Sequence, residues 1–186
     1  MSRFTVQATE LDGLAFVQRT AVGDERGLLS RMFCAEELRA AGWVWPISQI
    51  NHSLTKLAGT VRGMHFQYPP KAEAKLVSCV RGAVWDVAVD LRKGSPTFLL
   101  WHAEELSAAN RRALLIPPGF AHGFQALEPD CELLYLHSEP YDPALEGALN
   151  PCDPTLGIAW PLGIAVISDK DAQRPMISSD FQGVSL

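Results

Sequence analysis

Short runs rich in Val, Leu, Phe and Trp, separated by Gly- and Pro-containing turn signals, recur along most of the chain. Runs of this length bounded by such turns are typical of β-strands. The clearest turns are GDERG (23–27), YPP (68–70), RKGSP (92–96) and PPG (117–119). The pattern predicts strands at residues 14–20, 61–67, 74–80, 83–91, 97–106, 113–118, 123–127 and 132–138.

Helical patterning is scarce. AEELRAAG (35–42) has a convincing helical pattern, and Gly42 provides a natural stop. We expect a second short helix within residues 141–157. Many short strands and a few short helices predict an all-β protein, a β-sandwich or a barrel. Since no internal repeat, low-complexity linker or shift in composition divides the sequence, we predict one domain over residues 1–186.

The alternating segment AVWDVAVDL (83–91) places two carboxylates on one face of a predicted strand. Asp86 and Asp90 share that face with Val84 and Ala88. Burial of both carboxylates would be costly without partners. The face is therefore expected to meet solvent, arginines or a polar cavity, and a solvated face is the simplest of these interpretations.

Composition narrows the classes of function. The chain has 186 residues, 47% of them hydrophobic, which is enough for a substantial core. The net charge is −5 without a cluster of Lys and Arg, so no nucleic-acid partner is expected. No apolar run reaches the roughly 18 residues of a membrane span, and the N-terminus lacks the apolar core of a signal peptide. The four cysteines form no C-x-x-C pair, and we interpret them as reduced thiols of a cytoplasmic protein.

The stretch TVRGMHFQYPP (60–70) places a histidine in the middle of a predicted strand that prolines then end. Strict alternation sets His65 and Gln67 on one face and Arg62 on the other. A bulge at Gly63 would bring Arg62 and His65 together. Because a lone histidine in a strand is usually structural, its interpretation depends on the motifs elsewhere in the chain.

Two segments resemble cupin signatures. IPPGFAHGF (116–124) contains the P-x-G-x-x-H pattern of the second cupin signature, and residues 63–82 partly resemble the first. Metal-binding cupins place two histidines and a glutamate in the first segment and another histidine in the second. Here Gln67, a weak ligand, stands at one histidine position, and Glu73 and His122 are further candidate ligands. We expect no bound metal, and we keep a metal-dependent cupin enzyme as an alternative.

Longer motifs extend the similarity over nearly the whole chain, which resembles the dTDP-4-dehydrorhamnose 3,5-epimerase family. The resemblance implies a cupin-type jelly-roll homodimer without cofactor, acting on a nucleotide-diphosphate-linked 4-keto-6-deoxy sugar at C3, C5 or both. A non-catalytic sugar-nucleotide binder is the other alternative. The matching motifs are DERG (24–27), QINHS (49–53), VRGMHFQYPP (61–70), KLVSCVRGAVWDVAVDLRKGSPTF (75–98), ELSAANRRALLIPPGFAHGF (105–124), LLYLHSEPY (133–141), LGIAWP (156–161) and SDKDAQRP (168–175).

The chemistry of such a reaction asks for particular side chains. A ketone at C4 acidifies the hydrogens on C3 and C5, so a base can remove one and leave an enolate. An acid on the opposite face of the ring then returns a proton with inverted configuration. Positioned proton transfer contributes roughly 10²–10⁴-fold to the rate, and a donor to the enolate oxygen adds roughly 10²–10³-fold.

The resemblance also assigns roles to residues of this sequence. His65 matches the base, and Asp171 matches a paired carboxylate that would raise its basicity and fix its tautomer. Tyr135 matches the proton donor, and Lys75 suits the developing enolate oxygen. Arginines are the natural bidentate partners of the diphosphate. The positions expected to bind the substrate are Arg26, Arg31, Gln49, Asn51, Arg62, His122, Glu146 and Lys170.

The segment after DERG departs from the family pattern. Members that recognise thymine carry aromatic residues and then a glutamate there, whereas this chain has Leu29 and Arg31. Leu29 offers no ring for stacking, and an arginine can only donate hydrogen bonds. Cytosine and guanine present acceptors that suit such a donor. We therefore expect a CDP- or GDP-linked sugar to bind at least as well as a TDP-linked one.

Overall fold

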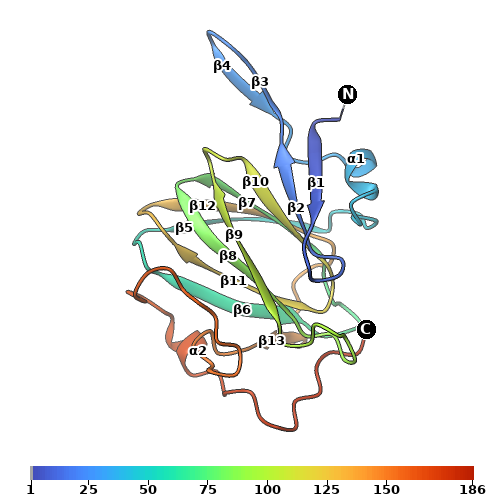
Figure 1. Cartoon of the computed structure of the whole chain (residues 1–186), viewed down its shortest axis with the longest axis vertical. Coiled ribbons are helices and arrows are strands. Elements are labelled where there is room, and N and C mark those ends of the chain that lie inside the picture. Colours follow the sequence, from blue (N-terminus) through green and yellow to red (C-terminus); the bar gives the residue numbers. More distant parts are fainter. Residues whose placement is uncertain (1) are drawn as a thin grey trace.

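The computed structural model describes residues 2–186, in which two β-sheets pack face to face (Figure 1). The six-stranded sheet has the order β1 (Phe4–Ala8), β2 (Ala15–Arg19), β10 (Arg112–Ile116), β7 (Lys75–Arg81), β12 (Cys131–His137) and β5 (Gln49–Thr55). The five-stranded sheet has the order β13 (Glu146–Ala148), β6 (Val61–Gln67), β11 (Phe120–Ala126), β8 (Ala83–Asp90) and β9 (Trp101–Ser107). The two layers confirm the predicted all-β jelly-roll sandwich.

The core lies between the two sheets because strand alternation directs apolar side chains inward. Val77 and Leu133 from the six-stranded sheet meet Val84 and Phe124 from the five-stranded one, and all four are buried. The outer face of the six-stranded sheet has its own apolar cover, in which Trp43 is buried. The sandwich is therefore packed with apolar side chains on both faces of its six-stranded sheet.

Helices are few and short. The predicted helix at 35–42 forms as α1 (Ala35–Arg39), with Gly42 at a positive φ of 102° just beyond it. The prediction of a helix within 141–157 is wrong, because that segment forms turns and strand β13. The second helix is instead α2 (Asp169–Ala172), begun by the side chain of Ser168. No helix within residues 2–186 has the length and apolar character needed to span a membrane.

A hairpin of β3 (Ala21–Asp24) and β4 (Gly27–Ser30) projects away from the sandwich (Figure 1). The predicted GDERG turn forms its tip. Its strands pair only with each other, and the side chain of Leu29 is 78% exposed. The hairpin therefore carries its residues far from the core of the sandwich.

Strand β6 contains the bulge that was predicted at Gly63. His65 lies opposite His122 on β11, but Arg62 lies opposite Phe124, so β6 holds one extra residue between the pairs. Gly63 has a φ of 138°, and an added Cβ would lie 2.5 Å from the Cα of Gly123. Only glycine fits, and the bulge turns Arg62 and His65 toward the same cavity.

The solvated interpretation of the carboxylates on β8 is wrong, because β8 is an inner strand whose face meets the opposite sheet. Asp86 and Asp90 are both fully buried. Asp86 lies 2.9 Å from His122, while Asp90 accepts hydrogen bonds from Arg92 at 2.7 Å and from nearby hydroxyls. Burial raises the pKa of Asp90, but Arg92 and these hydroxyls outweigh it and lower the pKa to about 2.

The hydroxyl of Thr97 donates to Asp90 at 2.6 Å and helps to hold residues 97–100 in a turn. Strand β9 consequently begins at Trp101, four residues later than the predicted start of the strand at 97–106. The apolar run at residues 98–101 predicts a strand from the sequence, and the hydrogen bond from Thr97 to Asp90 overrides it.

Candidate active site

A cavity of about 500 Å³ opens between the two sheets. Strands β6 and β11 supply one wall, and strands β5, β7 and β12 supply the other. The lining residues are Ile50, Asn51, His52, Ser53, Arg62, His65, Phe66, Gln67, Glu73, Lys75, His122, Phe124, Tyr135, His137, Tyr141 and Glu146. A ring held here would present opposite faces to the two sheets.

His65 and Asp171 form the predicted pair, with 2.7 Å between Nε2 and Oδ1. The side chain of Asp171 is only 6% exposed, and α2 holds it beneath β6 after its backbone N–H donates to Ser168. Since a carboxylate accepts, Nε2 carries the proton and Nδ1 is left as the basic atom. The sequence could not link these residues, because 106 positions separate them.

The basicity of His65 differs from the expectation. Burial lowers the pKa of His65, and the hydrogen bond and charge of Asp171 only partly oppose that shift. The pKa therefore lies below its ordinary value of 6.5. Asp171 does raise the pKa as predicted, but desolvation outweighs it, and His65 is a neutral base at pH 7.

Tyr135 lies on the facing sheet, on β12. Its hydroxyl is 3.1 Å from the hydroxyl of Ser53, and its ring stacks with that of His137 at 6.2 Å and meets that of His122 edge-on at 6.1 Å. Burial raises the pKa of Tyr135 above its ordinary value. The hydroxyl therefore stays protonated near neutral pH, as a proton donor must.

Lys75 crosses from β7 toward the base. Its Nζ donates to the backbone carbonyl of His65 at 3.2 Å and lies 3.0 Å from Oε1 of Glu73. The side chain is 8% exposed, so its charge is held in a site that excludes most water. A fixed cation in such a place stabilises a developing oxyanion more than it could in water.

His122 also binds a carboxylate, that of Asp86, at 2.9 Å. Burial raises the pKa of Asp86, and the charge and hydrogen bond of His122 oppose this. The pair lies beneath the cavity between β11 and β8, where it fixes the orientation of the His122 ring. His122 thus lines the cavity in which the resemblance expects the sugar to bind.

Three of the residues expected at the diphosphate lie at this cavity. Asn51 and Arg62 line it, and Gln49 donates to Asn51 at 3.1 Å beside it. The backbone N–H of Tyr141 also donates to Gln49 at 3.0 Å. Arg62 is exposed and donates to the backbone carbonyl of Leu54, so its guanidinium keeps further donors for an anion.

Glu146 lines the cavity mouth, and Lys170 reaches it from α2 at 2.7 Å. Arg174 and the hydroxyl of Tyr141 also bind Glu146, at 3.2 and 3.0 Å. Lys170 is the chief cause that lowers the pKa of Glu146, despite partial burial. The structure therefore brings Glu146 and Lys170 together, as a pair that ties α2 to the cavity.

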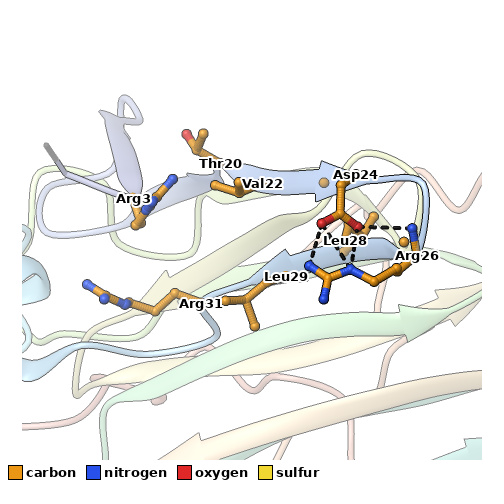
Figure 2. A pocket seen from close by; sticks show the side chains of 10 residues that line it. Arg3, Thr20, Val22, Asp24, Arg26, Leu28, Leu29 and Arg31 are labelled. Atoms are coloured by element: carbon orange, nitrogen blue, oxygen red, sulfur yellow. Dashed lines mark hydrogen bonds and ion pairs between the residues drawn. The ribbon is translucent and has the colours of Figure 1, made fainter.

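Arg26 and Arg31 lie elsewhere in the chain. They line a separate cavity of about 630 Å³ along the hairpin. Figure 2 shows Arg31 near Arg3 at one end, and Arg26 bonded to Asp24 at the other. Arg31 pairs with Glu37. Within one chain, neither arginine joins the cavity that holds His65.

The candidate metal ligands have other partners. The amide of Gln67 is buried and donates to the carbonyls of Lys71 and Pro140, so it serves the backbone. Glu73 and His122 each face a charged partner. Among residues 2–186, no group of three or more His, Cys, Asp and Glu side chains is placed to hold a metal ion.

The sequence motifs assign no role to some residues of the site. His137 and Ser53 line the cavity, and Asp86 is buried behind His122, while Glu73 is predicted only as a metal ligand. The signal for His137 was available, since it follows Tyr135 by two residues and a strand returns to the same face at that spacing. Ser53 lies on the edge strand β5, which carries polar residues on both faces. Its sequence therefore does not indicate which face meets the cavity.

Known proteins resemble this chain in sequence and in fold. A family profile described as dTDP-4-dehydrorhamnose 3,5-epimerase matches residues 8–179. The dTDP-4-dehydrorhamnose 3,5-epimerase of Sinorhizobium fredii is 41% identical over 180 residues, covering 91% of this chain and 92% of that protein. The dTDP-4-dehydrorhamnose 3-epimerase of Streptomyces niveus is 42% identical over 156 residues, covering 83% of this chain and 75% of that protein.

A solved structure agrees with the sequence relatives. The dTDP-6-deoxy-D-glucose-3,5-epimerase RmlC from Legionella pneumophila, in complex with dTDP-4-keto-L-rhamnose, superposes with a TM-score of 0.91 at 36% identity. The match covers 98% of this chain and 99% of that one. Because the profile, the relatives and the fold agree over most of its length, the chain belongs to the dTDP-4-dehydrorhamnose 3,5-epimerase family.

Proposed function

We propose that this protein is an isomerase that epimerises a nucleotide-diphosphate-linked 4-keto-6-deoxy sugar through an enolate. One observation carries the proposal: His65, backed by Asp171, and Tyr135 approach one cavity from opposite sheets. A sugar ring between the sheets would meet a base on one face and an acid on the other. That is the arrangement that inversion by proton transfer requires.

The residues perform the reaction in two steps. Nδ1 of His65 removes the proton next to the C4 ketone, and the electron pair moves onto the ketone oxygen to form the enolate. The ammonium of Lys75 stabilises that oxygen. Tyr135 then delivers its proton to the same carbon from the opposite face, and Ser53, 3.1 Å from the phenol, offers a path for reprotonation.

The names of the relatives support one site of inversion. The Sinorhizobium fredii protein is named a 3,5-epimerase, and the Streptomyces niveus protein is named a 3-epimerase. Position 3 is common to both names, so we propose inversion at C3 here, with C5 as the position on which family members differ. The sugar in the solved complex is linked to dTDP, which is the first nucleotide to test.

A homodimer reconciles the place of Arg26 with its expected role. Arg26 matches a diphosphate-binding position, yet its side chain is 85% exposed on a hairpin that leaves its own subunit. We propose that the hairpin of one subunit reaches the cavity of its partner. The apolar, exposed side chains of Leu28 and Leu29 would be covered in that arrangement. We further place the protein in the cytoplasm, with sugar-nucleotide biosynthesis as its setting.

The proposal is tested by NMR in D₂O with 4-keto-6-deoxy sugars linked to TDP, CDP, GDP and UDP. Wild-type protein is expected to introduce deuterium at C3 and to produce the inverted sugar. His65→Asn is expected to abolish this exchange and to keep nucleotide binding, because the base contacts the sugar and not the diphosphate. Absence of exchange with every substrate, despite measurable binding, would favour the non-catalytic alternative.

A further inference from the structure

Glu73 lies between two basic side chains of the cavity wall. Its Oε1 is 3.0 Å from Nζ of Lys75, and its Oε2 accepts from Nδ1 of His137 at 2.8 Å. The three side chains are at most 11% exposed, and each lines the cavity. Both oxygens of Glu73 therefore serve neighbours within the protein, and neither is free for a substrate.

The cluster holds a fixed arrangement of charge. Burial raises the pKa of Glu73, but Lys75 and His137 together outweigh it, so the pKa lies below its ordinary value. Glu73 is therefore an anion near neutral pH. Because a carboxylate can only accept, Nδ1 of His137 carries a proton. Its Nε2 lies 3.5 Å from the amide nitrogen of Asn51.

Glu73 is the charged group that accepts a hydrogen bond from His137. Lys75 is its cross-strand partner on β7, and Tyr135 stacks on it from the same strand. On the other side, β5 offers the neutral amides of Gln49 and Asn51. We infer that His137 influences the charged groups of the cavity through its hydrogen bond to Glu73.

We propose that His137 is a positioning residue for Lys75. By occupying one oxygen of Glu73, His137 leaves only the other for the ammonium, which stays aimed between the His65 carbonyl and the cavity. Without His137, the buried carboxylate has an unsatisfied oxygen, and turning further onto Lys75 would satisfy it. The ammonium would then be drawn away from the enolate oxygen. The inference rests on the proposed function, in which that oxygen develops charge.

The first experiment compares two variants of His137 in the deuterium-exchange assay. His137→Leu removes the donor, whereas His137→Asn places an amide nitrogen at the same number of bonds from the backbone as Nδ1. His137→Leu is expected to lower kcat roughly tenfold, less than the roughly 10²–10³-fold loss for removing an oxyanion donor outright. KM is expected to stay unchanged, and His137→Asn to retain most of kcat. Equal losses in both variants, or a change in KM alone, would overturn the proposal.

A double-mutant cycle shows whether His137 acts through Lys75. In a Lys75→Gln background, there is no ammonium left to position. His137→Leu is therefore expected to cause no further loss of the residual exchange rate in that background. A loss of the same size as in the wild-type background would mean that His137 acts independently of Lys75, which contradicts the proposal.

A second measurement does not depend on turnover. The ¹⁵N NMR signal of the Lys75 ammonium is expected to be visible in wild-type protein, because the ion pair slows its proton exchange. It should change markedly in His137→Leu and little in His137→Asn. An unchanged signal in His137→Leu refutes the inference even if the protein catalyses nothing. Wild-type protein without deuterium exchange refutes the proposed function alone.

Discussion

His65, His122 and His137 each lie within 3 Å of a carboxylate, yet their surroundings give them different tasks. His65 holds Asp171 through Nε2 and lines the cavity with a pKa that burial has lowered. Burial has the opposite consequence for Tyr135, where it disfavours the phenolate and raises the pKa. The same desolvation therefore leaves one group neutral as a base and the other neutral as an acid.

The pH dependence of the reaction should report the pKa of His65, which burial lowers and Asp171 raises. Deuterium exchange needs neutral His65, so kcat/KM should be constant at neutral pH and fall only below pH 6.5, the ordinary pKa. Asp171 raises that pKa. Asp171→Asn should therefore move the acid limb to still lower pH and reduce the plateau, because the base is weaker. A limb that moved to higher pH would reverse the assigned effect of Asp171.

Tyr135→Phe should separate the two proton transfers. The phenylalanine ring keeps the stacking with His137 but cannot donate a proton. Inverted product is expected to fall by roughly 10²-fold, the loss typical of one positioned acid. Exchange of deuterium with retained configuration should persist, because His65 can still remove a proton and return one from its own face. The matched control is Ser53→Ala, which keeps the phenol and should lower product formation less.

The roles of single residues could be predicted only for residues that lie within a recognised motif. His65, Lys75 and Tyr135 stand inside long matching segments, and the structure does bring them to one cavity. The sign of the net pKa shift at His65 could not be predicted, since it depends on desolvation by surrounding strands. The link from Glu73 to His137 spans 64 positions, and only the pairing of β7 with β12 creates it.

At the scale of elements, the bulge in β6 decides which side chains reach the cavity. Gly63→Ala would place a Cβ 2.5 Å from Gly123 and impose a φ of 138° on an L side chain. Overpacking of this kind typically costs about 1–3 kcal/mol. We expect the free energy of unfolding to fall by that amount in denaturant titrations, with loss of exchange activity as Arg62 and His65 lose alignment.

Gly27→Ala is the matched control for this variant. Gly27 has a similar φ of 130°, but nothing lies within 4 Å of an added Cβ. It therefore imposes the backbone strain without the collision. If both variants lose the same stability, strain alone explains the need for glycine and the close approach of β6 and β11 does not.

The hydrophobic pattern predicted the positions of strands better than it predicted whether their polar side chains are buried. Most inner strands form where the pattern placed them, because their apolar faces must be buried. The pattern of β8 was correct, but its carboxylates were misplaced in solvent, because alternation does not reveal their partners, His122 on β11 and Arg92 in the following turn. The missed hairpin has exposed apolar residues in both strands, and its position depends on no contact within the core.

At the scale of the whole molecule, the hairpin is the place to test nucleotide choice. Leu29 is exposed in the hairpin cavity and offers no ring. Calorimetry should therefore show CDP or GDP binding at least as tightly as TDP. Leu29→Phe should improve TDP binding by up to about 1–3 kcal/mol, the worth of base stacking on an aromatic ring.

Arg31 supplies the second arm of that experiment. Arg31→Glu should shift the preference toward TDP, because a carboxylate accepts from the thymine N3–H. Arg31→Ala is the control, since Arg31 pairs with Glu37 and any substitution removes that pair. A clear wild-type preference for TDP that Arg31→Glu leaves unchanged would place Arg31 outside the base site.

Mixing two inactive variants tests whether the active site is shared between subunits. Arg26→Ala removes the hairpin cation and keeps His65, whereas His65→Asn removes the base and keeps Arg26. If the hairpin serves the partner's cavity, a mixed dimer contains one site with both residues intact. Random re-assortment after unfolding and refolding together should then restore about a quarter of wild-type activity. If Arg26 instead folds back onto its own subunit, every site in the mixture lacks one of the two residues. Activity that stays at the level of the separate variants, in a mixture shown by mass spectrometry to contain mixed dimers, would rule out the shared site.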